Sequence, residues 1–179
     1  ALVTGGCGFI GSNLTHRLVC EGWQVDIVDD MSNGHLEFLD GLDIRVVLAD
    51  TLHLYENQAE TDRSKERTLV IQGDFVHDNI LNRIRRSKYD VIFHLAANPR
   101  IEFSVQNPVA TTETNLFKTV YISKPISSRP ANSETYVICK NFLGPFEKDS
   151  IGDKIINLML DKIKKYDRKP FICKKYLDT

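Results

Sequence analysis

Short apolar runs and stretches of helical apolar spacing follow one another along the chain. Four runs predict buried strands, at Ala1–Thr4, Trp23–Asp29, Thr68–Asp74 and Tyr89–Ala97. Apolar residues spaced three and four apart predict amphipathic helices over 11–20, 79–87 and 153–165. Strands separated by helices indicate a parallel sheet with right-handed crossovers. The sequence therefore predicts an α/β fold with a doubly wound parallel sheet.

Other stretches fit this alternation less well. Residues 31–42 are rich in turn-forming residues, and residues 44–49 predict a short strand. Residues 55–67 are polar with mixed charge, and we expect a solvated loop or insertion there. Residues 135–139 have β-branched character and predict a later strand.

The first predicted strand leads into a glycine-rich turn. Gly5, Gly8 and Gly11 have the spacing G-x-x-G-x-x-G, and a helical pattern begins at Ile10. Glycine permits positive φ and lets a phosphate approach the backbone closely, while a helix N-terminus favours an anion. This turn therefore predicts a site for the pyrophosphate of a dinucleotide. Within it, Cys7 is expected to be the cysteine most exposed to the ligand.

An acidic residue ends the second predicted strand. Asp29 lies close to the offset of about 20 residues at which a carboxylate binds the adenosine ribose, and Asp30 could share that role. A carboxylate there accepts from the ribose 2′-OH and repels a 2′-phosphate, which favours NAD over NADP. Asp74 and residues 96–98 follow two other strands, whose carboxyl ends meet at the same edge of the sheet. Together these strand ends predict a Rossmann-type NAD site.

Two segments, Thr4–Ser12 and Asp29–Asn33, read T-G-G-C-G-F-I-G-S and D-D-M-S-N. They resemble the extended short-chain dehydrogenase/reductase family of nucleotide-sugar epimerases, dehydratases and decarboxylases. Gly73–Phe75 resembles the family's G-D-hydrophobic element, and Phe93–Ala97 resembles its H-x-A-A strand. The resemblance implies NAD contacts at Gly5, Gly8, Phe9, Ile10, Gly11, Asp29, Asp30, Asn33, Asp74, Phe75, Leu95, Ala96, Ala97, Asn98 and Asn115.

Two of these contacts also have a second interpretation from their position alone, and His94 is interpreted from its position beside them. Asp74 could be a turn or N-cap acid, and Asn115 could be a polar residue on a helix face. His94 alternates with buried positions, so it is predicted to be a hydrogen-bonded core histidine rather than a catalytic base.

The resemblance lapses after Val120, where the family continues toward a catalytic Tyr-x-x-x-Lys. We interpret the chain as segments joined across residues missing near 120–121. In the family a tyrosinate acts as general base toward a sugar hydroxyl, and the lysine lowers the pKa of that tyrosine. By resemblance, Tyr121, Ser123 and Lys124 are the end of this catalytic motif, and Asn141 contacts the pyrophosphate of the nucleotide sugar. Tyr121 is one residue closer to Lys124 than the motif requires, so an alternative places the catalytic tyrosine in the missing segment.

Two other placements of the catalytic group stay open. In one, residues 120–123 form a strand that supplies Ser123 or a serine at 127–128 as the catalytic hydroxyl. In the other, Tyr136 pairs with Lys140 at the required spacing of four residues.

Composition limits the function without naming it. Of 179 residues, 42% are hydrophobic and 26% are charged, and the net charge of −1 suggests neither nucleic acid nor a charged membrane as a partner. No apolar run approaches the roughly 20 residues that span a bilayer. The four cysteines lack metal-ligand spacing, so we expect reduced thiols, no metal and a cytoplasmic protein.

The resemblance implies an NAD-dependent epimerase that oxidises and re-reduces C4 of a UDP-hexose and forms a homodimer through helix 100–120. The alternatives are a dehydratase or decarboxylase of the same family and a non-catalytic NAD-binding protein. We divide the chain into an NAD-binding Rossmann domain, 1–124, and a remnant of a later strand with a small, incomplete substrate-binding lobe, 125–179.

Overall fold

A computed structural model describes residues 1–59, 68–98, 100–127, 136–139 and 161 of the chain. Within these residues, six strands form one sheet in the order β3–β4–β2–β1–β5–β6, and every neighbouring pair is parallel. The strands are β1 (Leu2–Thr4), β2 (Asp26–Asp29), β3 (Ile44–Leu48), β4 (Thr68–Gln72), β5 (Val91–His94) and β6 (Tyr136–Cys139). The predicted parallel α/β fold is confirmed, and the strands predicted at 44–49 and 135–139 are β3 and β6.

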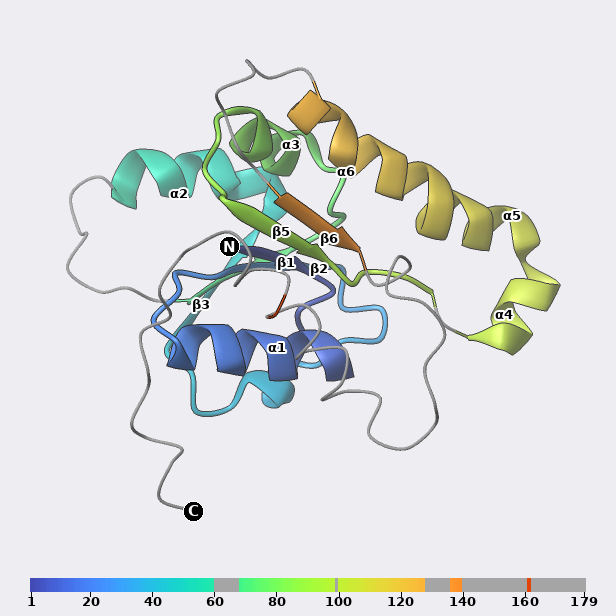
Figure 1. Cartoon of the computed structure of the whole chain (residues 1–179), viewed down its shortest axis with the longest axis horizontal. Helices are drawn as coiled ribbons and strands as arrows, with labels where there is room; N and C mark the ends of the chain where they lie inside the picture. Colours follow the sequence, from blue (N-terminus) through green and yellow to red (C-terminus); the bar gives the residue numbers. More distant parts are fainter. Residues whose placement is uncertain (60–67, 99, 128–135, 140–160, 162–179) are drawn as a thin grey trace.

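Helices connect these strands (Figure 1). They are α1 (Phe9–Cys20), α2 (Leu52–Ala59), α3 (Asp78–Arg85), α4 (Ile101–Gln106), α5 (Pro108–Thr112) and α6 (Lys118–Ser127). Two 3₁₀ turns, η1 (Leu36–Leu39) and η2 (Ala49–Thr51), precede β3 and α2. A π-helical turn, η3 (Glu113–Phe117), joins α5 to α6, so the stretch from 108 to 127 is helical throughout. Among the described residues, no helix is both long and apolar enough to cross a membrane.

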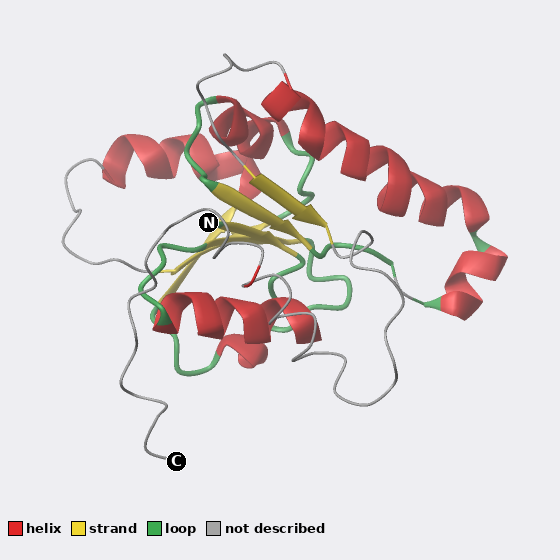
Figure 2. Ribbon diagram, in the orientation of Figure 1, coloured by secondary structure: helices red, strands yellow, loops and turns green. Residues whose placement is uncertain are grey.

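Helices cover both faces of the sheet (Figure 2). On one face, Val3 of β1 packs in a core with Leu14 of α1. On the other, Leu2 of β1 packs in a second core with Ile80 of α3 and Ile122 of α6. Neighbouring residues of a strand point to opposite faces, so one short apolar strand contributes to both cores. These two cores fix α1 on one face and α3 and α6 on the other.

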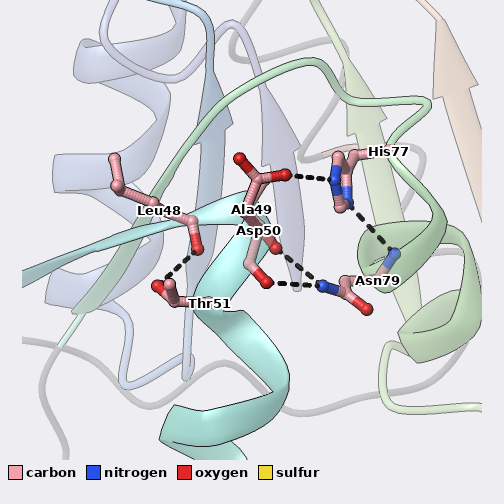
Figure 3. A network of polar contacts seen from close by, with 6 residues as sticks. All are labelled: Leu48, Ala49, Asp50, Thr51, His77 and Asn79. Atoms are coloured by element: carbon pink, nitrogen blue, oxygen red, sulfur yellow. Dashed lines mark hydrogen bonds and ion pairs between the residues drawn. The ribbon is translucent and has the colours of Figure 1, made fainter.

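A polar network holds the beginning of α3 against the end of β3 (Figure 3). The N–H of Asn79 donates to Nδ1 of His77 at 3.2 Å, so His77 caps the helix with its ring. In the neutral ring Nε2 then has the proton and donates to Oδ1 of Asp50 at 2.8 Å. The Asn79 side chain also donates to the Ala49 carbonyl at 2.9 Å. The network therefore sets the position of the loop that follows β4.

Two local predictions are wrong. Residues 55–59 belong to α2 rather than to a solvated loop, because Leu52 is fully buried and anchors the first turn of that helix in the core; residues 60–67 lie outside the described residues. Residues 120–123 form no strand, because they belong to α6, whose fully buried Ile122 shares a core with Ile92 of β5 and Ile80 of α3.

The predicted domain boundary falls inside a helix. α6 continues through residues 124 and 125, and β6 pairs with β5 in the same sheet. Apart from residues 125–127, β6 and Asp161, the predicted lobe 125–179 lies outside the described residues, and so do the predicted helix 153–165 (except Asp161), Lys140 and Asn141. The division of the chain at 124 stays a prediction.

Candidate functional site

The carboxyl ends of the central strands surround a cavity of about 530 Å³. β1 lies between β2 and β5, and the chain passes to the other half of the sheet when it reaches β5. In open parallel sheets, ligands bind where the strand order reverses in this way. The cavity is lined by Gly5, Gly8, Phe9, Ile10, Gly11, Val28, Asp29, Asp30, Ser32, Asn33, Gly34, Gly73, Phe75, Leu95, Ala96, Ala97, Asn98 and Thr114.

The glycine turn brings the backbones of β1, α1 and β5 close together. Gly5 has φ +68°, and a Cβ there would lie 2.8 Å from the N atom of Ala96. A Cβ on Gly11 would lie 2.1 Å from the carbonyl oxygen of Gly5. No larger residue fits at either position without moving backbone. Two of the three spaced glycines therefore close the turn.

The N-terminus of α1 opens toward this cavity. Gly8 is the N-cap and provides no side-chain hydrogen bond, and the first turn contains no acidic residue. Within the described part of the chain, the N–H groups of Phe9, Ile10 and Gly11 therefore have no internal acceptor. These donors and the positive end of the helix dipole favour a phosphate group at this edge.

Asp29 is held rigidly beside the turn. Its side chain accepts from Cys7 N at Oδ2 and from Met31 N at Oδ1, both at 2.9 Å. Burial raises the pKa of this carboxyl, and the two backbone N–H groups oppose the rise. Each oxygen has a further acceptor position, so Asp29 can bind a hydroxyl in the cavity.

The prediction that Cys7 is exposed to the ligand is wrong. Its side chain is fully buried in the core beneath the turn, beside Leu14. Burial, and then the charge of Asp29, raises the pKa of the Cys7 thiol to about 12. The thiol therefore stays protonated, although its backbone N–H holds Asp29.

The chain after β5 forms the opposite wall of the cavity. The hydroxyl oxygen of Thr4 accepts from the N–H groups of Leu95 and Ala96 at 3.1 and 3.2 Å. Farther along, Asn98 N donates to Oδ1 of Asn115 at 2.7 Å, and Nδ2 of Asn115 donates back to the Asn98 carbonyl at 3.1 Å. Asn115 does not line the cavity, but it fixes a residue that does.

His94, at the end of β5, is a core histidine as predicted. It is 4% exposed, and both ring nitrogens are within hydrogen-bond distance of threonine hydroxyls, on Thr4 and Thr119. Burial lowers the pKa of the ring to about 4. The imidazole is therefore neutral and fully hydrogen-bonded.

Asp74 lies in the turn after β4 and does not line the cavity. Its Oδ1 accepts from Val76 N at 3.1 Å, and its Oδ2 accepts from Nζ of Lys118 at 2.5 Å. Asp74 is therefore a turn acid rather than a helix N-cap, because the N-cap of α3 is His77. Its neighbours Gly73 and Phe75 do line the cavity.

The residues first predicted for catalysis, Tyr121, Ser123 and Lys124, all lie on helix α6. Tyr121 is 55% exposed and does not line the cavity. Ser123 and Lys124 follow it on the same helix, which packs on α3. Tyr136 of the third placement begins strand β6. The catalytic roles of these residues stay predictions.

Sequence reasoning missed several residues that line the cavity. Ser32 and Gly34 lie beside predicted contacts in the loop after β2 and could have been included from that position. Thr114 reaches the cavity from the π-helical turn η3, and no local pattern in the sequence indicates that.

A comparison with protein families matches residues 2–139 to the family described as GDP-mannose 4,6 dehydratase. Among curated relatives, UDP-glucose 4-epimerase of Mycolicibacterium smegmatis is 32% identical over 123 residues, which is 69% of this chain and 33% of the relative. UDP-glucuronic acid decarboxylase 1 of Arabidopsis thaliana is 29% identical over 141 residues, covering 75% of this chain and 26% of the relative. The chain thus spans about a third or less of these relatives.

Solved structures show the same fold at lower identity. UDP-glucose 4-epimerase from Thermotoga maritima aligns with a TM-score of 0.56 and 20% identity, covering 92% of this chain and 50% of that one. The UDP-glucose 4-epimerase from Thermus thermophilus in complex with NAD aligns with a TM-score of 0.51 and 18% identity, again covering 92% of this chain and 50% of that one. The family match covers all six described strands and the whole glycine turn, and the chain therefore belongs to the extended short-chain dehydrogenase/reductase family of nucleotide-sugar epimerases and dehydratases.

Proposed function

We propose that this chain is the cofactor-binding part of an NAD-dependent nucleotide-sugar epimerase that acts at C4 of a UDP-hexose in the cytoplasm. The observation that supports it most is the cavity where the strand order reverses, with the open N-terminus of α1 on one side and Asp29 on the other. NAD, when bound, supplies the hydride acceptor for oxidation of the sugar.

The described residues account for binding of such a cofactor. The free N–H groups at Phe9, Ile10 and Gly11 suit its pyrophosphate. The fixed carboxylate of Asp29 suits a ribose hydroxyl and disfavours a 2′-phosphate, because two negative groups would meet in a partly buried site. The wall at Ala96 and Asn98 limits the cavity on the β5 side.

Calorimetric titration of the full chain with NAD and NADP tests this proposal. We expect NAD to bind more tightly, and Asp29→Asn to weaken NAD binding by roughly 10- to 100-fold, the loss expected for a charged hydrogen bond, while narrowing the preference over NADP. Asp40→Asn is the matched control, because Asp40 is an exposed carboxylate that does not line the cavity, and it should leave binding of both dinucleotides unchanged. No binding of either dinucleotide to the wild-type chain contradicts the proposal.

Turnover decides among the activities. Incubation of the full-length protein with UDP-glucose, UDP-galactose and UDP-glucuronate should interconvert the first two. Release of CO₂ from the third, or dehydration of a hexose, supports the decarboxylase or dehydratase alternative, which the Arabidopsis relative suggests. NAD binding with no product from any nucleotide sugar supports the non-catalytic alternative, which the exposed position of Tyr121 suggests.

We also propose a homodimer formed through the helical stretch after β5. Large apolar side chains are exposed along it, at Ile101, Val105, Val109, Leu116, Phe117 and Val120. Exposed apolar surface of this extent is typical of an interaction site. Light scattering after size-exclusion chromatography should give twice the chain mass, and Val109→Glu should shift the protein to the monomer. A monomeric wild-type protein contradicts the proposal.

A further inference from the structure

Three side chains, the buried Thr4 and His94 and the half-buried Thr119, form a series of hydrogen bonds across the end of the sheet. Nδ1 of His94 lies 2.7 Å from Oγ1 of Thr4, and Nε2 lies 2.9 Å from Oγ1 of Thr119. These hydrogen bonds therefore join the central strand β1, through strand β5, to helix α6.

The direction of each bond follows from the acceptors. Oγ1 of Thr119 donates to the Asn115 carbonyl at 2.9 Å, which uses its proton, so Nε2 of His94 must donate to Thr119. Nδ1 of the neutral ring is then an acceptor, and Thr4 donates to it. The lone pairs of Thr4 accept from Leu95 N and Ala96 N. Each polar proton of the three side chains thus has an acceptor, and both ring nitrogens of His94 have a partner, in one arrangement.

Both ends of this series of hydrogen bonds lead to the wall of the cavity. At one end, Thr4 holds the N–H groups of Leu95 and Ala96, which line it. At the other, Thr119 holds the carbonyl of Asn115, whose side chain makes paired hydrogen bonds with Asn98. The wall is therefore tied on both sides to the same imidazole.

The π-helical turn η3 connects the same hydrogen bonds to a second part of the cavity wall. Single π-helical turns inside α-helices are frequent at functional sites. This one contains Asn115 and, beside it, Thr114, the single residue of η3 that lines the cavity. The Thr119–Asn115 bond spans the junction of η3 and α6, so it fixes the turn that presents Thr114.

The order of the strands assigns this wall to one half of the ligand. Asp29 ends β2, the glycine turn follows β1, and Leu95–Asn98 follow β5, in that order across the sheet. A dinucleotide with its adenosine at Asp29 and its pyrophosphate at the turn places its second nucleoside against Asn98 and Thr114. ADP, which ends at the pyrophosphate, does not reach them.

We propose that Thr4, His94 and Thr119 are positioning residues for the second nucleoside of the dinucleotide, which Thr114 contacts directly. This inference rests on the proposed function. Thr119→Val removes the acceptor for Nε2 of His94 and the donor to Asn115, yet keeps the shape of the side chain. The consequence should be confined to the half of the ligand that lies beyond the pyrophosphate.

Titration of the full chain with NAD and with ADP tests the proposal. We expect Thr119→Val to weaken NAD binding by about tenfold, the equivalent of one buried hydrogen bond, with ADP binding unchanged and Thr119→Ser restoring NAD binding. Thr111→Val is the matched control, because Thr111 makes the same kind of bond to the Asn107 carbonyl on α5 but has no histidine partner and does not line the cavity.

Each other outcome is decisive. Equal losses for NAD and ADP show a general structural role, and no loss shows no role; either overturns the inference. Should Thr119→Val fail to fold, the wild-type chain supplies the test, because the nitrogen-15 resonances of His94 should shift when NAD is added and not when ADP is added, and equal shifts overturn the inference. A wild-type chain that binds neither ligand overturns the proposed function, and a wild-type chain that binds both keeps that function whatever the variants do.

Discussion

Acid should destabilise this chain through His94. The ring is 4% exposed, and burial lowers its pKa from 6.5 to about 4. Between these values the unfolded chain binds a proton that the folded chain does not, so the free energy of unfolding falls as the pH falls from 6.5 to 4. Since each pKa unit corresponds to about 1.36 kcal/mol, the loss is about 3 kcal/mol, a large part of the roughly 5–15 kcal/mol that stabilises a domain.

Urea unfolding at a series of pH values measures this loss. The comparison is with His94→Gln, which cannot titrate, and we expect the wild-type slope to exceed that of the variant by up to about 1.4 kcal/mol per pH unit near pH 5. Titration of Asp29 changes the free energy of unfolding in the opposite direction, because its raised pKa lets the folded chain bind a proton more readily than the unfolded chain does. Asp29 is present in both proteins, so its contribution cancels in the difference between their slopes.

Nitrogen-15 NMR of the wild-type imidazole gives an independent answer that needs no variant. The hydrogen bonds require the Nε2–H tautomer, with Nδ1 as acceptor, down to about pH 4. A ring that titrates near 6.5, an Nδ1–H tautomer, or equal pH slopes in the two proteins would refute this reasoning.

Three further predictions follow from single contacts. Gly11→Ala should destabilise the fold by about 1–3 kcal/mol and abolish NAD binding, because its Cβ overlaps the Gly5 carbonyl; a variant that melts and binds like the wild type contradicts this. Cys7 should resist iodoacetamide at pH 8 in the folded chain while the half-buried Cys20 reacts, and mass spectrometry showing the reverse order contradicts the burial argument. His77→Ala should cost about 1 kcal/mol in urea unfolding, whereas His77→Asn keeps a capping acceptor and should cost less; equal losses exclude a capping role.

The layered fold could be predicted because its signals are local. Each strand is a short apolar run whose alternate residues enter the two cores, and α1 and α3 show the apolar spacing of helices with one buried face. α2 could not be predicted in this way, since the buried residue that anchors it, Leu52, lies before the polar stretch that the sequence presents as a loop.

The cavity was predictable to the extent that it follows strand ends. Gly5, Gly11 and Asp29 act within a few residues of the strands that place them, so spacing alone locates them. Contacts between residues far apart in the sequence could not be located from spacing. Lys118 holds the carboxylate of Asp74 from 44 positions away, and Thr114 reaches the cavity only because of a π-helical turn. Neither feature leaves a periodic pattern.

The position of Ile122 bears directly on the prediction that Tyr121 is catalytic. Adjacent helix residues point about 100° apart. Ile122 points into the core and is fully buried, whereas Tyr121 beside it faces solvent and is 55% exposed. A general base must come within hydrogen-bond reach of the hydroxyl that it deprotonates, and its removal costs roughly 10²- to 10⁴-fold in rate. In a preparation that turns over a nucleotide sugar, we expect Tyr121→Phe to leave kcat within about twofold of the wild type, because the exposed side chain does not line the cavity. A loss in that larger range would instead place Tyr121 in the catalytic machinery and require α6 to lie differently when the sugar is bound.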